Sequence, residues 1–469
     1  MTDDLIYANG VSGLTGDYLL KPMPPSRVAE TAKERGPDAP DELGAFRSGM
    51  EAETFGPPFD RDPELVSDVG WAIVTSENED PAIKEALGPL VAHRREAAGD
   101  ELTKELDYRE GERLNDWLAR HGVAPGNLQP EKVPYYVLLV GSPERIPFSF
   151  QYLLDIEYAV GRLDFDEATD CAAYSTAVIE QETGGGARRE RAATFFGTRH
   201  AFDRATQMSA DSLVCPLAEA FGPEGRFAKA VAGYRIDPLI GEPATKDTLA
   251  EVLKGTGASG RPALLFSASH GMGGWPAGHP EQESKHGALL CQDWPGVGQI
   301  DASQYFAAAD VPADADVRGM VAFFFACYGG GTPAVDAFER TEGVGPAKIA
   351  ERPFTARLPR ALLKAGALAV AGHVERAWGY SFMAGNKEQL GTFANTIGLS
   401  LAGKPVGHAM TDFNERYAAL ASSLLDLLDE IRRAGRVVPD AVVAAQWTER
   451  TDAQNYLLLG DPAVALRTA

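Results

Sequence analysis

The chain has 469 residues, more than one average domain, and 44% of them are hydrophobic, which is enough for a sizeable core. Its formal net charge of −23 argues against a nucleic-acid-binding protein, because phosphates require a basic face, and it would favour a basic partner or substrate. No apolar run approaches the ~18 residues of a membrane span, and the acidic N-terminus lacks the features of a secretory signal. We therefore expect a cytoplasmic protein that does not enter a membrane.

The four cysteines, Cys171, Cys215, Cys291 and Cys327, lie far apart and form no CxxC pair. Such a set in a chain of this length does not indicate a disulfide scaffold, and a cytoplasmic location would keep the thiols reduced. Three of them are interpreted as ordinary core or surface thiols. Cys327 is different because of the sequence around it.

Three regions follow one another along the chain. Residues 1–64 are rich in Pro, Gly and charge and predict an extension that wraps the body or is partly mobile. Residues 65–240 form a first α/β unit, in which strands are expected at 71–75, 135–141, 158–161 and 193–196 and helices at 81–98 and 111–120. Alternation of strands and helices is typical of a parallel sheet with helical crossovers.

The pattern restarts in residues 241–469, after a helix expected near 247–253. Apolar runs at 262–267, 320–326 and 367–371 predict strands that run directly into His270, Cys327 and His373. Continuous apolar runs of this kind suit parallel strands covered on both faces. Helices are expected at 387–401 and 417–433, the second with leucines along one face.

His270 and Cys327 form the candidate catalytic pair. Open parallel sheets place their ligands at the carboxyl ends of strands, and two of the predicted strands end in these residues, 57 positions apart. A thiolate can attack an amide carbonyl while an imidazole moves protons and backbone N–H groups hold the oxyanion. Glycines next to both residues would let a substrate backbone approach closely. Taken alone, each residue would more often be structural than catalytic.

Two segments carry a resemblance to a known group of enzymes. Ser267-Ala268-Ser269-His270-Gly271 and Phe325-Ala326-Cys327-Tyr328-Gly329-Gly330 resemble the active-site segments of clan CD cysteine peptidases, the group of caspases, legumain, separase and gingipains. Caspases carry Gln-Ala-Cys-x-Gly with the histidine roughly 50 residues upstream. Here Phe325 replaces the glutamine, which argues against caspase-type specificity for Asp.

Gingipain-like peptidases are similar over more of the chain. Val137-Leu138-Leu139-Val140-Gly141, Ala159-Val160-Gly161-Arg162-Leu163 and Leu458-Leu459-Gly460-Asp461-Pro462 resemble three of their segments, in the same order around the pair. The resemblance runs from about residue 70 to the C-terminus. It implies an α/β fold: a caspase-like α/β/α sandwich with a mostly parallel sheet in residues 241–469, preceded by a smaller gingipain-like α/β subdomain in residues 65–240.

The resemblance also implies roles for individual residues. Cys327 would be the nucleophile, His270 would protonate the leaving amine, and the N–H groups of Gly271 and Cys327 would form the oxyanion hole. Glu375, Trp378, Asp155 and Glu157 would belong to the S1 pocket, which implies cleavage after Arg or Lys, although Arg376 could instead select an acidic residue. No cofactor or catalytic metal is implied. Relatives often hold structural calcium, but no acidic cluster marks such a site here.

The sequence thus predicts a cysteine endopeptidase that acts through a thioester acyl-enzyme on a protein or peptide substrate. An intracellular protease must be restrained, so an activating partner, a ligand or self-cleavage is expected. The N-terminal extension is one candidate inhibitory segment, and the loop from Gly329 to Pro353 is another. Two alternatives stay open. One is a non-catalytic caspase-like interaction module, and the other is an α/β small-molecule-binding protein that uses its glycine loops as anion nests.

Overall fold

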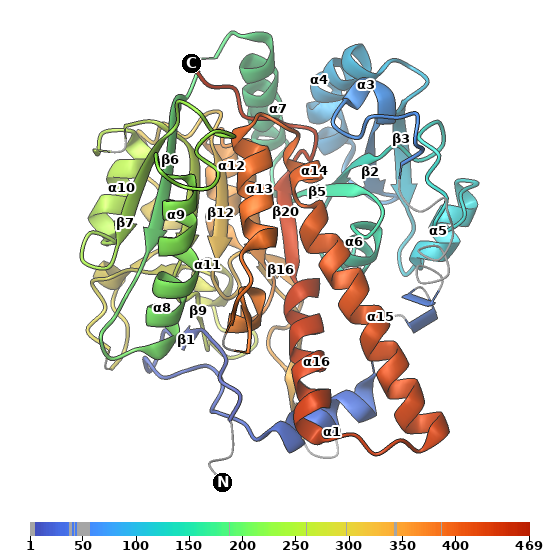
Figure 1. Ribbon diagram of the computed structural model, residues 1–469. Coiled ribbons are helices and arrows are strands. Elements are labelled where there is room, and N and C mark those ends of the chain that lie inside the picture. The colour runs from blue at the N-terminus through green and yellow to red at the C-terminus, as the bar shows by residue number, and fades with distance from the viewer. Residues whose placement is uncertain are drawn as a thin grey trace.

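The computed structural model describes residues 5–36, 40–41, 43–44, 57–186, 188–258, 260–296, 298–341, 345–385 and 387–469. Within these residues, ten strands form one central sheet in the order β3-β2-β4-β5-β20-β17-β12-β8-β6-β7 (Figure 1). The strands are β2 (Trp71–Ser76), β3 (Thr103–Tyr108), β4 (Tyr136–Val140), β5 (Ala159–Leu163), β6 (Glu190–Gly197), β7 (Arg235–Ile240), β8 (Pro262–Ala268), β12 (Val321–Phe325), β17 (Ala369–His373) and β20 (Tyr456–Gly460).

The sheet is parallel except at one place, where β17 pairs with β20 in the antiparallel sense. On one side of this junction β17, β12, β8, β6 and β7 share one direction, and on the other side β20, β5, β4, β2 and β3 share the opposite one. The predicted fold class, an α/β protein with a large and mostly parallel sheet, is confirmed.

Helices lie in front of and behind the sheet, with α9, α13 and α15 in front in the view of Figure 1. The long ones are α1 (Pro25–Arg35), α4 (Pro81–Ala98), α7 (Ala168–Thr183), α10 (Lys246–Lys254), α12 (Arg357–Lys364), α13 (Gly391–Leu401), α15 (Thr411–Ala434) and α16 (Asp440–Gln454). The short ones are α3 (Val66–Val69), α5 (Leu114–Arg120), α6 (Phe148–Leu154), α8 (Arg204–Ser209), α9 (Cys215–Phe221), α11 (Gln282–Lys285) and α14 (Val406–Ala409). A π-helical turn, η1 (Ala210–Val214), joins α8 to α9.

The central strands are buried along their whole length because both faces of the sheet are covered. Every residue of β8, β12 and β17 is buried, which explains the continuous apolar runs of the sequence. These three strands are neighbours and run in the same direction, so their carboxyl ends meet at one edge of the sheet. That edge carries the candidate site.

The sheet continues across the boundary that the sequence suggests between residues 240 and 241. Strands β6 and β7 come before this boundary in the chain, yet they lie beside β8 in the second half of the sheet. The division into residues 1–64, 65–240 and 241–469 therefore stays a prediction about sequence regions. The single sheet means that both halves share one hydrophobic core.

Short strand pairs decorate the edge of the sheet that carries the site. They are β1 (Val11–Ser12) with β9 (Met272–Gly273), β10 (Leu289–Leu290) with β11 (Tyr305–Phe306), β13 (Gly331–Thr332) with β16 (Phe354–Thr355), β14 (Val335–Thr341) with β15 (Gly345–Lys348), and β18 (Met383–Ala384) with β19 (Lys387–Glu388). Three 3₁₀ turns complete the structure: η2 (Ala302–Gln304), η3 (Ala308–Asp310) and η4 (Gly379–Ser381).

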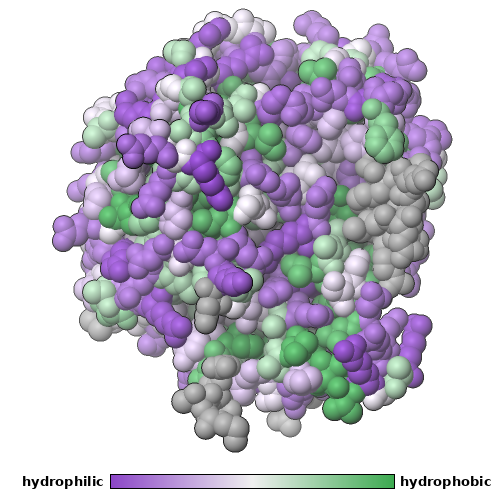
Figure 2. All heavy atoms as spheres, in the orientation of Figure 1, coloured by the Kyte–Doolittle hydropathy of each residue, from purple (hydrophilic) through white to green (hydrophobic). Residues whose placement is uncertain are grey.

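The described part of the predicted extension packs against the body. It contributes β1, which pairs with a loop of the site, and α1, which packs on α16 (Figure 1). The face of the molecule in Figure 2 is mostly hydrophilic. Among the helices that the structure describes, none is both long and apolar enough to cross a membrane.

Candidate active site

The structure brings His270 and Cys327 to neighbouring strand ends. Strands β8 and β12 pair in parallel with Ala268 opposite Phe325, and each candidate residue follows two positions later. The N–H of Ser269 donates to the carbonyl of Phe325 at 3.2 Å and continues the pairing beyond the strands. The two side chains that the sequence analysis selected therefore start from adjacent points of the same sheet edge.

Gly271 lies directly against the backbone of Cys327. A methyl group added at Gly271 would be 1.8 Å from the carbonyl oxygen of Cys327 and 2.7 Å from its nitrogen. On its other side, Gly271 forms an antiparallel bridge with Leu289, and the ladder bonds run from Met272 and Leu290 on either side of it. The N–H of Gly271 is not used by that ladder, so it is available to an oxyanion.

Both ring nitrogens of His270 have partners. Nε2 lies 3.0 Å from Oδ2 of Asp203, and Nδ1 accepts the backbone N–H of Gly10 at 3.0 Å. An N–H donor at Nδ1 requires that nitrogen to be unprotonated, which leaves Nε2 as the protonated nitrogen that donates to Asp203. The ring is only 1% exposed, and the two hydrogen bonds fix its orientation with Nδ1 on the side of Gly10.

Asp203, which contacts His270, is a candidate site residue that was not predicted from the sequence. It precedes α8, where its side chain caps the helix by accepting the N–H of Thr206 at 2.8 Å, and it also accepts the hydroxyl of Tyr18. Burial raises the pKa of Asp203, but the hydrogen bonds from His270, Tyr18 and Thr206 outweigh that effect. The net effect holds the pKa well below its ordinary value, so the carboxylate facing His270 is ionised.

The thiol of Cys327 is closed off in this conformation. The side chain is fully buried, and its Sγ accepts the backbone N–H of Ala377 at 3.3 Å. Burial raises the pKa of the Cys327 thiol to about 12, and the hydrogen bond from the Ala377 N–H acts in the opposite direction. Cys327 is therefore a protonated thiol in the state that the structure describes.

The loop that follows Cys327 is strained and is tied to the loop after β17. Tyr328 and Glu375 have φ angles of 58° and 71°, and they are the non-glycine residues with positive φ in the described chain. The N–H of Tyr328 donates to the carbonyl of Glu375 at 2.6 Å, so the two strained positions support each other. Backbone strain of this kind costs on the order of 1–3 kcal/mol per residue and concentrates at functional sites.

Of the predicted S1 residues, Glu375 and Trp378 lie in this loop. Its carboxylate accepts from Arg376 at 2.8 Å, and the same guanidinium nitrogen bonds Asp336 at 2.5 Å. Burial raises the pKa of Glu375, and the charge of Arg376 opposes that rise. Trp378 is buried against Phe338, with ring centroids 4.6 Å apart, so it serves packing in this conformation.

A pocket of about 280 Å³ opens beside Glu375. Its walls include Phe148 and Tyr152 of α6 and Trp447 of α16, which supply aromatic surface around the carboxylate. Arg35 and Arg450 also line it. The pocket has the composition of a side-chain subsite, and it lies on the same loop that Tyr328 anchors.

Asp155 and Glu157 lie at the start of β5, which two strands, β20 and β17, separate from β12. Asp155 accepts the N–H of Val160 at 3.2 Å, and Glu157 accepts the N–H of Gly126 at 2.7 Å. Burial raises the pKa of both carboxyls, that of Glu157 to about 7. The structure connects both to the first half of the chain, and none of its described hydrogen bonds joins them to His270 or Cys327.

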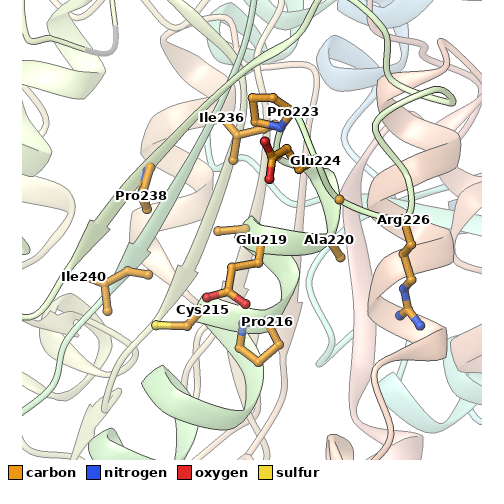
Figure 3. Close-up of a pocket in the computed structure, with 13 residues that line it drawn as sticks. Cys215, Pro216, Glu219, Ala220, Pro223, Glu224, Arg226, Ile236, Pro238 and Ile240 are labelled. Atoms are coloured by element: carbon orange, nitrogen blue, oxygen red, sulfur yellow. The ribbon is translucent and has the colours of Figure 1, made fainter.

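A larger hollow lies away from this site. About 1020 Å³ of space opens between α9 and β7, lined by Cys215, Glu219, Glu224, Ile236 and neighbouring residues (Figure 3). None of the residues of the candidate pair lines it. Within the described chain, no group of three or more His, Cys, Asp or Glu side chains is placed to hold a metal ion.

Comparison with known proteins gives little beyond the fold. No family model matches the chain. No curated protein matches it either. A solved structure titled as that of a protease is 11% identical, with a TM-score of 0.48, over 87% of this chain and 80% of the other. The Saccharomyces cerevisiae separase–securin complex is 10% identical, with a TM-score of 0.28, over 70% of this chain and 16% of the other. At such identities the chemistry must be argued from the site itself.

Proposed function

We propose that the protein is a cysteine endopeptidase in which Cys327 is the nucleophile and His270 the acid–base group. The observation that carries this proposal is the arrangement at the sheet edge. A cysteine and a histidine follow adjacent parallel strands, and a buried carboxylate binds the far nitrogen of the histidine. Nucleophile, base and orienting acid are the three parts that activated thiol chemistry uses.

The proposed reaction uses Nδ1 of His270, the ring nitrogen that lies on the side of Gly10, away from Asp203. Nδ1 takes the proton of the Cys327 thiol, and the sulfur attacks the carbonyl carbon of the scissile peptide. The N–H groups of Gly271 and Cys327 stabilise the resulting oxyanion. Nδ1–H then protonates the leaving amine, which gives a thioester that water hydrolyses. Asp203 keeps Nε2 protonated and stabilises the imidazolium that forms between these steps.

We propose a basic P1 residue, with the pocket beside Glu375 as the S1 subsite. A buried carboxylate at an aromatic-lined pocket suits a guanidinium or ammonium group, whereas an acidic P1 side chain would meet like charge. Arg376, which already pairs with Glu375, and Arg35 and Arg450, which line the pocket, act against a basic side chain. Matched fluorogenic peptides ending in Arg, Lys, Asp or Leu test the proposal, because preference for Asp would transfer selection to Arg376.

Labelling by an acyloxymethyl ketone peptide tests the catalytic proposal directly. Such a probe reacts only with a thiolate that a neighbouring acid–base group activates, so the modified residue identifies the nucleophile. We expect peptide mass spectrometry to find the label on Cys327, and to find none in the Cys327→Ala or His270→Ala variant. Equal labelling of the half-buried Cys215 would instead indicate thiol accessibility and would contradict the proposal.

The closed Cys327 keeps one alternative in view. A fold of this kind with a protonated, buried thiol could serve as a binding module without cleavage. Digestion of a denatured protein mixture, followed by identification of new N-termini, separates the two functions. New N-termini that depend on both Cys327 and His270 support the peptidase. If Cys327 reacts with the ketone probe but no new N-termini form, the result supports the binding module.

A further inference from the structure

The N-terminal segment forms a hairpin that lies over the candidate pair. We define the N-terminal hairpin as residues 5–24. Ile6 and Met23 exchange two backbone hydrogen bonds of 2.9 and 3.1 Å, and the N–H of Leu19 donates to the carbonyl of Gly10 at 3.1 Å. The N–H of Ser12 donates to the carbonyl of Asp17 at 2.8 Å and closes the turn. The hairpin is therefore a defined structure rather than a loose strand.

Gly10 contacts both members of the pair at once. Its N–H donates to Nδ1 of His270, the nitrogen that takes the thiol proton in the proposed reaction. A methyl group at position 10 would lie 3.0 Å from Sγ and 3.2 Å from Cβ of Cys327, so the glycine is already in contact with the nucleophile. The Gly10 nitrogen thus occupies the place where the leaving amine of a substrate would need the proton of His270.

The hairpin also pairs with the loop that follows His270. Val11 and Ser12 of β1 run parallel to Met272 and Gly273 of β9, and the N–H of Gly13 donates to the carbonyl of Gly273 at 3.0 Å. An extended backbone is recognised here through main-chain hydrogen bonds, as peptides are when they add to a sheet edge. The groups of β9 that hold the hairpin are ones that any extended peptide could use.

A third contact engages the positioning acid. The hydroxyl of Tyr18 donates to Asp203, and the Tyr18 ring meets the ring of His270 edge to face at 5.6 Å. Burial and the bond to Asp203 raise the pKa of Tyr18, so the hydroxyl keeps its proton and remains a donor. The hairpin therefore engages Cys327, His270 and Asp203 together.

We propose that β9 is the substrate-backbone site on the leaving-group side of the scissile bond, and that the N-terminal hairpin occupies this site as an internal inhibitor. The proposal rests on the peptidase function proposed above. A substrate can reach His270 and Cys327 only after Gly10 leaves, because the two would otherwise share one place. The occupied state explains why the thiol is buried and His270 is held with Nδ1 already satisfied.

Gly10 is the position where a substitution can displace the N-terminal hairpin from the site at β9 with the least change to the rest of the protein. Its φ is +91°, a region that favours glycine, and a side chain there would press on Cys327 and on Leu19. Gly99 is the matched control, since its φ is +83° but nothing lies within 4 Å of an added methyl group. Gly10→Val and Gly99→Val therefore share the backbone strain, and only the first expels the hairpin.

Alkylation of Cys327 by iodoacetamide measures whether the N-terminal hairpin covers the site, and it does not require catalysis. We expect the rate of Cys327 modification at pH 8, followed by peptide mass spectrometry, to rise at least tenfold in Gly10→Val and to stay within twofold of the unchanged chain in Gly99→Val. Tyr18→Phe, which removes only the bond to Asp203, should give a smaller rise of about twofold to tenfold. Unchanged Cys327 rates in both Gly10→Val and Tyr18→Phe, in variants that melt as cooperatively as the unchanged chain, would overturn the proposal.

A synthetic peptide of residues 5–24 supplies the complementary test. Added to Gly10→Val, it should restore protection of Cys327, whereas the same peptide carrying Gly10→Val should not. No protection by either peptide at millimolar concentration would contradict the assignment of β9 as a backbone site. The readouts also separate the two proposals. Faster alkylation of Cys327 without peptide cleavage would refute the peptidase and show only that the hairpin covers Cys327. Peptide cleavage with unchanged alkylation rates would support the peptidase and refute the internal inhibitor.

Discussion

Asp203 acts on the proposed reaction through His270 and is a positioning residue. Asp203→Asn keeps the helix cap, because asparagine is as good an N-cap as aspartate, but it removes the charge that stabilises the imidazolium. We expect kcat for a fluorogenic peptide to fall about 10²–10⁴-fold in the Gly10→Val background, with KM changed far less. Steady-state kinetics from pH 5 to 9 measure this.

The matched control for that variant is Asp211→Asn in the same background. Asp211 lies in the π-helical turn that follows α8 and pairs with Arg199 on the surface, so its loss should leave kcat within twofold. A purely structural role for Asp203 would lower the melting temperature and leave the pH profile of the remaining activity unchanged. That result would remove Asp203 from the proposed machinery.

Gly271 tests how closely the two strand ends must approach. The Gly271→Ala methyl group would overlap the backbone of Cys327, which cannot move away as a flexible side chain could. We expect labelling of Cys327 by the ketone probe to be lost and the free energy of unfolding to fall by about 1–3 kcal/mol. Gly391→Ala, at an exposed glycine with nothing within 4 Å, should change neither in urea denaturation and labelling.

The sequence placed His270 and Cys327 at the ends of neighbouring strands because each follows a long apolar run, and both runs are buried strands in the structure. Asp203 follows β6, a strand whose first residues are charged, and its partner Tyr18 lies 185 positions earlier in the chain. Hydropathy carries no signal for such a distant contact. The one available hint was the Asp-x-x-Thr cap after β6, at the same sheet edge as His270.

At the scale of the elements, uniformly apolar interior strands were predicted and outer strands that contain charged residues were not. The interior strands β2, β4, β8, β12 and β17 were predicted within one or two residues at most ends, because burial on both faces makes them uniformly apolar. The outer strands β3 and β7 were missed. Their sequences, TKELDY and RIDPLI, mix charge with apolar residues because they form the two edges of the sheet, and Pro238 suits an edge strand.

Glu157, at the start of β5, gives a pH-dependent prediction. Burial raises its pKa to about 7, so between its ordinary value and that pH the folded chain holds a proton that the unfolded chain has lost. The stability that the neutral form contributes is present below the ordinary pKa and is lost as pH rises through about 7. Glu157→Gln stays neutral and should gain on the order of 2 kcal/mol over the unchanged chain between pH 4.5 and pH 8.

Urea denaturation of the unchanged protein and of Glu157→Gln at these pH values measures the difference in the free energy of unfolding. The contributions of other titrating groups cancel in this comparison. The same variant tests the predicted S1 role. Since the hydrogen bond of Glu157 goes to Gly126, we expect the preference among Arg, Lys, Asp and Leu peptides to be unchanged. A specific loss of cleavage after Arg and Lys would return Glu157 to the S1 pocket.

At the scale of the whole molecule, the N-terminal hairpin contacts two hydrophobic clusters whose other residues lie far apart in the sequence. Ile6, Ala8 and Leu20 enter a satellite core with α1, α15 and α16, while Val11 enters a second one with Trp275 and Trp294. Gly10 sits between these two cores, opposite the candidate pair. Composition marked residues 1–64 as an extension, but it could not place one of its glycines in the active site.

This arrangement predicts that binding of a ligand at the candidate site is coupled to the stability of the N-terminal hairpin. A peptide probe on Cys327 and Gly10 in its observed position exclude each other. By linkage, the probe must weaken binding of the hairpin to the site as much as the hairpin weakens binding of the probe. We expect hydrogen exchange of residues 5–24 to accelerate at least tenfold in the labelled protein. Exchange in α1 should rise less, because its contacts with α16 do not involve the pair, and exchange in β8 and β12 should not change. Methylation of Cys215 provides the control for a modification outside the site. Protection of residues 5–24 that survives labelling of Cys327 would show that substrate enters beside the hairpin rather than in its place.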